Sequence, residues 1–166
     1  MHRAILIAGC LVAGIVSHAR AADSDGTKPD DVLTPGDIRP EATREELCSP
    51  SFHTISERNV SAAVKAATQR AYAPPGAIAP PWCIGAVCPK DHRVPLELGG
   101  TNRPGSIRNI WAQEYKASKR KDLCENRVHK AMCAGDLTLQ DAQAIFLGDW
   151  TVGCRPYVPG LRDGKP

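Results

Sequence analysis

The cysteines limit the fold of this chain more than any other residue type. Seven are present in 166 residues, and Cys10 lies within a segment that has the layout of a secretory signal peptide. That segment has a basic Arg3, an apolar run over residues 4–16 and small residues up to Ala21. An apolar run of this length is too short to span a bilayer. We therefore expect a signal peptide over residues 1–21, and its cleavage leaves six cysteines in the mature protein.

Lipidation of Cys10 is the competing interpretation, because residues 7–10 resemble a bacterial lipobox. The apolar run before Cys10 would then be only about six residues long, and the apolar segment after it would have no purpose. A signal peptide explains both halves of the segment, so we expect a secreted or periplasmic protein without stable membrane insertion. Oxidising compartments favour disulfides, and here up to three can form among Cys48, Cys83, Cys88, Cys124, Cys133 and Cys154.

Two of these cysteines lie in a helix that we expect over residues 115–134, which has good helix formers, no proline and a possible C-terminal cap at Gly135. In such a helix Cys124 and Cys133 lie on opposite faces and about 13 Å apart along the axis. A disulfide needs Cα atoms within about 7 Å of each other. Each helix cysteine must therefore bond elsewhere.

The other four cysteines offer partners for them. Cys83 and Cys88 flank a four-residue loop and can bond to each other. In that case Cys48 and Cys154 take one helix cysteine each and fasten both ends of the domain to the helix. Structural zinc is not expected, because the two-residue spacing of zinc ribbons is missing.

The composition predicts one small α+β domain over residues 48–155. Residues 22–47 are rich in Asp, Pro and Gly and have no sustained apolar period, which predicts a mobile leader. Residues 156–166 are again rich in Pro and Gly and predict a flexible tail. A short alanine-rich helix is expected over residues 59–72 before a proline-rich loop.

Short strands are expected between residues 82 and 98, where apolar residues alternate with turn residues, and Gly99-Gly100 predicts the turn that closes them. Thr138, with Asp141 three residues later, resembles a capping box. It predicts a last helix from Thr138 to about Trp150.

The formal net charge of +3 hides an uneven distribution. Residues 22–81 contain six basic and nine acidic side chains, whereas residues 82–166 contain thirteen basic and nine acidic ones. Residues 103–130 alone contain eight basic and three acidic side chains, so a polyanion would bind there. Only eight residues are aromatic, which argues against a groove that stacks single-stranded bases.

The most informative segment begins with Asp91 and His92. On a short strand, neighbouring residues point to opposite sides, so the carboxylate and the imidazole can do different jobs. Asn109 follows seventeen residues after His92 and beyond the Gly-Gly turn. It can return alongside the histidine if the two segments form a hairpin.

This segment resembles the HNH endonucleases. The resemblance rests on Asp91-His92 followed by Pro95-Leu96 and Gly99-Gly100, on Asn109-Ile110-Trp111, and on residues 121–135 and 139–150, a pattern similar to that of small secreted bacterial HNH-like proteins. It covers roughly residues 82–152, and more weakly residues 48–72. It implies a β-hairpin and a following helix, the ββα-metal motif, that bind one divalent cation.

Carried over to this chain, the resemblance makes His92 the general base that removes a proton from the attacking water, Asn109 its orienting partner and Asp91 a metal ligand. The implied cofactor is one divalent ion, with Mg²⁺ expected and Mn²⁺ or Zn²⁺ as alternatives. It would stabilise negative charge on the phosphoryl oxygens and on the leaving oxygen.

The chain departs from the HNH pattern at the second metal ligand. The family supplies a His or Asn from the helix after Asn109, but residues 116–120 contain no strong ligand. Glu125 and His129 lie four residues apart and share a helix face, so they are the substitutes we consider. Asn126 is a further option. A histidine in the position of His129 is more often structural or exposed than a metal ligand.

Basic residues recur at three- and four-residue steps along the same helix, so that a fair share point the same way. Such a face can be merely solvated, but beside a hydrolytic site it would bind phosphates with little sequence preference. The candidate contacts to the DNA or RNA backbone are Arg93, Arg108, Lys116, Lys119, Arg120, Lys121, Arg127 and Lys130.

The pattern as a whole predicts a secreted, monomeric, metal-dependent endonuclease that hydrolyses phosphodiester bonds of DNA, or alternatively RNA, with low sequence specificity. The alternative is a catalytically inactive, disulfide-linked binding module that keeps the HNH-like fold without the metal. The weak second-ligand position favours this alternative.

Overall fold

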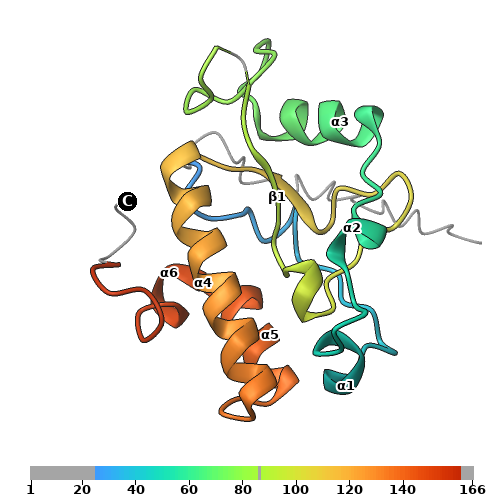
Figure 1. The fold of residues 1–166 in the computed structure, drawn as a ribbon. Coiled ribbons are helices and arrows are strands. Elements are labelled where there is room, and N and C mark those ends of the chain that lie inside the picture. Colours follow the sequence, from blue (N-terminus) through green and yellow to red (C-terminus); the bar gives the residue numbers. More distant parts are fainter. Residues whose placement is uncertain (1–24, 86, 162–166) are drawn as a thin grey trace, which may run out of the picture.

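The computed structural model describes residues 25–85 and 87–161 (Figure 1). The expected signal peptide, and Cys10 with it, lies outside these residues. The two strands β1 (Lys90–His92) and β2 (Ile110–Ala112) form an antiparallel sheet in the middle of the molecule. Helix α3 (Ala62–Tyr72) packs against β2 on one side. The described chain is therefore α+β, as expected.

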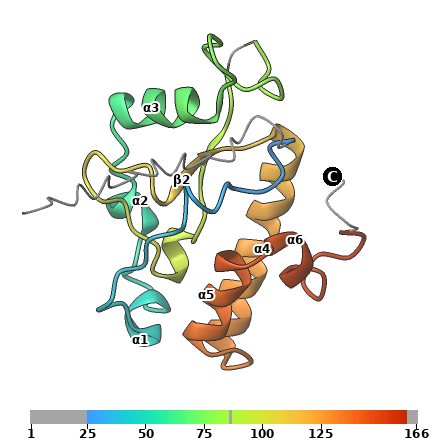
Figure 2. The same ribbon diagram turned by 180° about the vertical axis from the view of Figure 1, so that it is seen from behind.

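Helices α4 (Tyr115–Ala134) and α5 (Leu139–Leu147) pack together on the other side of the sheet, and α6 (Trp150–Gly153) packs on α5 (Figures 1 and 2). Two single-turn helices, α1 (Arg44–Leu47) and α2 (Thr54–Glu57), precede α3. The main hydrophobic core lies between α4, α5 and α6, where Cys124, Val128, Phe146 and Trp150 are buried.

The sheet is shorter than the sequence predicts. Its register pairs Asp91 with Trp111 and His92 with Ile110, and pairing ends there. The Asn109 side chain accepts a hydrogen bond from the Val94 amide (2.9 Å) and donates one to its carbonyl (3.1 Å), so those groups cannot extend the ladder. Residues 96–98 form the 3-10 helix η2 (Leu96–Leu98) instead of a strand.

The helix limits follow from their caps. Helix α4 has the expected bounds, because the Glu114 side chain accepts the Ala117 amide (2.8 Å) and Gly135 ends the helix with φ +91°. Thr138 caps α5 through the Asp141 amide (3.0 Å), also as expected. Helix α5 ends three residues before Trp150, however, and the chain turns at Gly148 before α6 begins.

All six remaining cysteines form disulfides. Cys48 bonds to Cys133 and Cys124 to Cys154, with Cα–Cα distances of 5.5 and 5.8 Å. Cys83 bonds locally to Cys88, with a Cα–Cα distance of 4.7 Å. The expected pairing of each helix cysteine with one end of the domain is confirmed. Three disulfides indicate an oxidising, extracytoplasmic environment.

Residues 25–47 are packed against the domain, which corrects the expectation of a mobile leader for this part of the chain. Thr34 is fully buried, with its hydroxyl 2.8 Å from the Tyr72 hydroxyl and 3.2 Å from the Ile110 carbonyl oxygen. Figure 2 shows the segment running beside β2. The Trp150 indole donates to the Thr27 carbonyl (2.9 Å). The leader's polar groups therefore find partners in the domain despite its low apolar content.

The expected flexible tail is also corrected over residues 156–161. Val158 and Leu161 are buried in the main core, and Tyr157 and Val158 donate backbone hydrogen bonds to Cys154. None of the helices in the described ranges is long and apolar enough to cross a membrane.

Candidate active site

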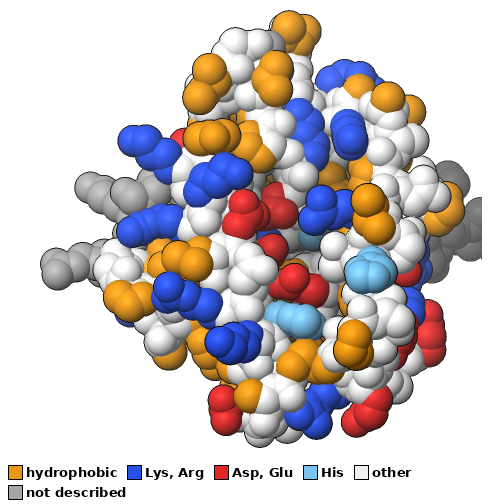
Figure 3. Space-filling model, in the orientation of Figure 1, with side chains coloured by type: hydrophobic (Ala, Val, Ile, Leu, Met, Phe, Trp, Pro, Cys, Tyr) orange, Lys and Arg blue, Asp and Glu red, His pale blue; other side chains and the backbone are white. Residues whose placement is uncertain are grey.

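A pocket of about 500 Å³ opens where β1, η2, α4 and the segment between α2 and α3 meet. Figure 3 shows acidic side chains gathered in the middle of this face and basic side chains around them. Strand β1 brings both Asp91 and His92 to the pocket, although neighbouring residues of a strand were expected to point to opposite sides. The ionisable side chains that line the pocket are Arg58, Lys65, Lys90, Asp91, His92, Glu97, Asp122 and Glu125.

The His92 imidazole is held by a neighbour that the sequence did not reveal as a partner. Its Nε2 atom lies 2.9 Å from the Oδ1 atom of Asn102, and the Asn102 amide nitrogen donates to the Glu57 carbonyl (3.1 Å). Because that amide nitrogen is committed to a carbonyl, Oδ1 faces the ring and Nε2 must carry the proton. Nδ1 is then the ring atom with a free lone pair.

The His92 ring is neutral in this environment. Burial lowers the pKa of His92 to about 4, although the negative charge of Asp91 raises it in part. A neutral imidazole with a free Nδ1 lone pair is able to accept a proton.

Asn109 lies behind the pocket and is buried. Besides its two hydrogen bonds to Val94, its side chain donates to the Thr101 carbonyl (3.2 Å), and its own carbonyl accepts the Arg93 amide (2.9 Å). These bonds fix the loop between β1 and β2 at both ends. Asn109 therefore positions the backbone of His92, while Asn102 positions the ring.

Lys121 occupies the centre of the site, although we expected it on a phosphate-binding surface. Its side chain is 1% exposed, and its Nζ atom lies 3.0 Å from Asp91 Oδ2 and 2.6 Å from the His92 carbonyl oxygen. It also forms an ion pair with Glu125. Burial lowers the pKa of Lys121, but Asp91 and Glu125 outweigh this effect and raise it above its ordinary value. All three ammonium protons are used within the protein.

Two carboxylates, Asp91 and Glu125, pair with this ammonium group, and Asp122 lies close to them. One oxygen each from Asp91, Asp122 and Glu125 lie within 4.8 Å of one another, a grouping that can hold a metal ion. Burial raises the pKa of Glu125 to about 8, and burial together with the charge of Asp91 raises the pKa of Asp122. The nearby Glu97 has a buried Oε1 atom without a hydrogen-bond partner in the described structure, and burial raises its pKa too.

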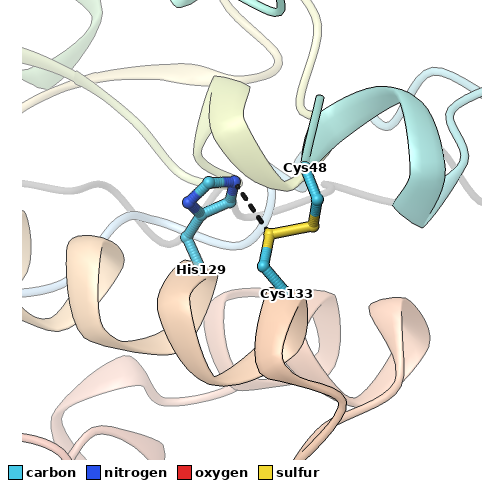
Figure 4. Close-up of side chains that lie close together, drawn as sticks. All are labelled: Cys48, His129 and Cys133. Carbon is cyan, nitrogen blue, oxygen red and sulfur yellow. Dashed lines mark hydrogen bonds between the residues drawn. A yellow bond between two sulfur atoms is a disulfide. The ribbon is translucent and has the colours of Figure 1, made fainter. Parts of the chain in front are cut away.

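The two candidate substitutes for the missing metal ligand separate in space. Glu125 belongs to the group around Asp91, whereas His129 does not. The Nε2 atom of His129 lies 3.1 Å from the Leu47 carbonyl oxygen and 3.5 Å from Cys133 Sγ, beside the Cys48–Cys133 disulfide (Figure 4). Oxidised cysteines offer no thiolates, so this second group is not a metal site in the disulfide-bonded protein. Asn126, the further option, lines the pocket.

Two of the eight candidate phosphate contacts are buried, so their side chains are not open to a nucleic acid backbone. Arg93 is 5% exposed. Its guanidinium donates to the Thr34 (2.8 Å) and Phe146 (3.3 Å) carbonyls and pairs with Asp31. It joins the leader to α5. Lys121 is the other buried residue.

The remaining six lie at or near the surface. Lys116, Lys119, Arg127 and Lys130 are exposed on α4, and Arg120 is half-buried. Figure 3 shows basic side chains over this helix. Some already have partners, because Lys119 pairs with Asp122 (3.6 Å) and Arg127 donates to the Tyr157 carbonyl. Arg108, on the loop before β2, pairs with Asp37 (3.3 Å).

Comparison of the chain with protein-family models, with curated proteins and with solved structures finds no match. Its function must therefore be inferred from the pocket and the sequence pattern. The pocket combines an oriented neutral imidazole, a group of carboxylates and a buried ammonium ion.

Proposed function

We propose that the protein is a secreted, metal-dependent endonuclease of the HNH type that hydrolyses phosphodiester bonds of DNA, or alternatively RNA, with low sequence specificity. One observation carries this proposal: the His92 ring, oriented by Asn102, shares a pocket with the carboxylates of Asp91, Asp122 and Glu125. The chain order of β1, β2 and α4 supports an HNH-like hairpin-helix unit.

In this proposal His92 is the general base. Its Nδ1 atom takes a proton from the attacking water, and Asn102 Oδ1 accepts a hydrogen bond from Nε2–H and keeps the ring in place. A base with a pKa of about 4 is weak. A bound phosphodiester brings negative charge next to the imidazole, which raises its pKa towards the neutral range where proton transfer is efficient.

The residues present fit a hard divalent cation. The ion would be held by the carboxylates of Asp91, Asp122 and Glu125. Mg²⁺ and Mn²⁺ prefer such oxygen ligands, whereas Zn²⁺ prefers nitrogen and sulfur. When all three are ionised, these carboxylates carry three negative charges against the ammonium ions of Lys121 and Lys119, so the group keeps negative charge that a divalent ion can balance. Such an ion would stabilise charge on the phosphoryl and leaving oxygens.

The exposed basic residues of α4 would bind the phosphate backbone beside the pocket. Asp122, Glu125 and Asn126 line the pocket from the same helix, so a strand crossing α4 reaches the catalytic centre. Contacts of ammonium and guanidinium groups with phosphates are salt-sensitive and independent of base sequence.

A specific observation favours the second candidate function, an inactive binding module. The Lys121 ammonium ion already lies against Asp91 and Glu125 and neutralises part of the charge that would attract a metal. In that case the pocket would bind its ligand without a divalent ion and without cleavage.

The deciding experiment incubates the purified mature protein with plasmid DNA and with RNA, in Mg²⁺ or Mn²⁺, with and without EDTA. We expect metal-dependent cleavage that falls at least about 100-fold in His92→Ala, because a general base commonly contributes that much. His53→Ala is the matched control, since His53 is exposed and outside the pocket. Equal inertness of the wild type and His92→Ala with every metal would contradict catalysis and favour the binding module.

A further inference from the structure

Two lysines separate the catalytic pocket from a second pocket. Lys65, on α3, and Lys90, at the start of β1, line the first pocket together with His92. The same two lysines line a neighbouring pocket of about 290 Å³, which continues over α3 to Arg70. A ligand that extends beyond the catalytic centre in this direction must pass between or over these two ammonium groups.

The Lys90 ammonium group is held in place by the fold. Its Nζ atom donates to Gln69 Oε1 (2.5 Å) and to the Cys88 carbonyl oxygen (3.0 Å). Both acceptors are neutral, and two bonds leave one of the three ammonium protons free. The local disulfide between Cys83 and Cys88 fixes the loop that carries this carbonyl.

Within the described residues, neither Lys65 nor Lys90 forms an ion pair, whereas Lys119, Arg108 and Lys121 all do. The nearby Arg58 forms no ion pair either, although its charge acts on Glu97. Lys65 lies close enough to Lys90 for the two positive charges to repel each other. A fold that keeps two like charges together beside a pocket gains stability when an anion binds between them.

We propose that Lys65 and Lys90 bind the phosphate adjacent to the scissile one in a nucleic acid strand, and that the strand continues into the second pocket towards Arg70. This inference rests on the proposed nuclease function of the His92 pocket. It names the substrate class, a polynucleotide rather than a small phosphodiester, because only a chain with consecutive phosphates reaches both places. Lys65 and Lys90 would then form a basic surface on the α3 side of the carboxylates, in addition to the basic face of α4.

The test compares two substrates, a fluorescein-labelled single-stranded oligonucleotide and bis(p-nitrophenyl) phosphate, in Mn²⁺. In Lys65→Gln/Lys90→Gln we expect kcat/KM for the oligonucleotide to fall by about tenfold or more, mainly through KM, since two charge-assisted contacts are lost. Activity on the small diester should stay unchanged. The dependence of oligonucleotide affinity on salt should weaken, with the log–log slope reduced by about 0.7 for the loss of one single-strand phosphate contact.

The matched control is Lys28→Gln/Arg155→Gln, which removes two charges from exposed side chains outside both pockets. An equal loss in this control, or an equal loss on both substrates in the lysine variant, would overturn the inference. Lys65→Gln alone provides a variant that should fold normally, because Lys65 is exposed on α3. Its oligonucleotide KM should rise.

Failure of the proposed function gives a different result. If the wild type cleaves neither substrate, the nuclease proposal is wrong. Fluorescence anisotropy of the oligonucleotide still tests the phosphate contact in that case. Weaker binding by Lys65→Gln/Lys90→Gln than by the control variant would support the contact, and equal binding would overturn it.

Discussion

The Nε2 atom of His92 lies 2.9 Å from the Oδ1 atom of Asn102, and Asn102 in turn donates to the carbonyl of Glu57. The ring is therefore oriented by a neutral amide rather than by a carboxylate. A neutral partner leaves burial as the largest influence on the imidazole, which keeps its pKa at about 4. A carboxylate in the same place would have favoured the imidazolium.

Replacement of Asn102 by aspartate should reverse this effect. In Asn102→Asp the new carboxylate would face Nε2, and we expect the pKa of His92 to rise by about one to two units. The measurement is an NMR titration of the imidazole protons in EDTA. An unchanged His92 titration in Asn102→Asp would contradict the contact.

The low pKa of His92 also predicts how stability depends on pH. The folded pKa of about 4 lies below the unfolded value of about 6.5, so the unfolded chain binds a proton first as the pH falls. The free energy of unfolding therefore includes the full contribution of His92 above pH 6.5. As the pH falls from 6.5 towards 4, this contribution of about 3 kcal/mol is lost.

The measurement is urea unfolding of the wild type and of His92→Gln at several pH values in EDTA. The difference in unfolding free energy between the two proteins should shift steadily against the wild type between pH 6.5 and 4, and remain constant above pH 7. A difference that is flat over the acidic range would mean that His92 is not desolvated in the folded protein.

The sequence was sufficient to predict the parts of the structure that depend on local signals. The cap at Gly135 predicted the end of α4, and the spacing of Cys124 and Cys133 predicted that each bonds outside the helix, because caps and helix geometry act over a few residues. Which of Cys48 and Cys154 takes which helix cysteine stayed open. The antiparallel pairing of β1 with β2 agrees with the hairpin expected around the Gly-Gly turn, although the register, with His92 opposite Ile110, was not predicted.

Contacts between distant segments were not predictable in the same way. The position of Lys121 depends on how α4 packs against β1, and a basic run in the sequence indicates a surface rather than a buried ion. The same holds for residues 25–47. Their composition predicts a mobile segment, and only the contacts of Thr34 with the distant Tyr72 and Ile110 show that they are packed. Asn102 was within the informative segment, but only the turn around Gly99 and Gly100 brings its amide to the ring.

The disulfides should differ in their effect on stability. Cys48–Cys133 spans 85 residues, whereas Cys83–Cys88 spans 5. In the chain-entropy description, removal of the long bridge costs about 4.6 kcal/mol and removal of the short one about 2 kcal/mol. We expect Cys48→Ser/Cys133→Ser to lower the unfolding free energy clearly more than Cys83→Ser/Cys88→Ser. The reverse order in denaturant unfolding would contradict this ranking.

Metal binding to the carboxylates should release protons. The pKa of Glu125 is raised to about 8 and that of Asp122 is raised as well, so part of the group is protonated near neutral pH. A divalent ion requires the ionised form. The apparent affinity for Mn²⁺ should therefore increase as the pH rises from about 6 to 8.

Isothermal titration calorimetry in two buffers with different ionisation enthalpies measures this release directly. Glu125→Gln should weaken Mn²⁺ binding and reduce the number of protons released. Glu45→Gln is the matched control, because Glu45 lies on α1 outside the pocket. Mn²⁺ binding that is independent of pH and unaffected by Glu125→Gln would place the ion elsewhere.

Lys121 provides the sharpest distinction between the nuclease and the binding module. Lys121→Met removes a buried ammonium ion and leaves Asp91 and Glu125 without their partner. In EDTA we expect a loss of about 3–5 kcal/mol in unfolding free energy, as is usual when one member of a buried ion pair is removed. Lys119→Met, on the exposed face of the same helix, should change stability by less than about 1 kcal/mol.

Added Mn²⁺ should then restore part of the lost stability. If the carboxylates form a metal site, the ion balances the charge that Lys121 neutralised, and the Tm of Lys121→Met should rise more on addition of Mn²⁺ than the Tm of the wild type. Thermal unfolding with and without Mn²⁺ measures the difference. No rise in either protein would mean that the buried ammonium ion is the only cation this site accepts, which is the behaviour of the binding module rather than of a metal-dependent nuclease.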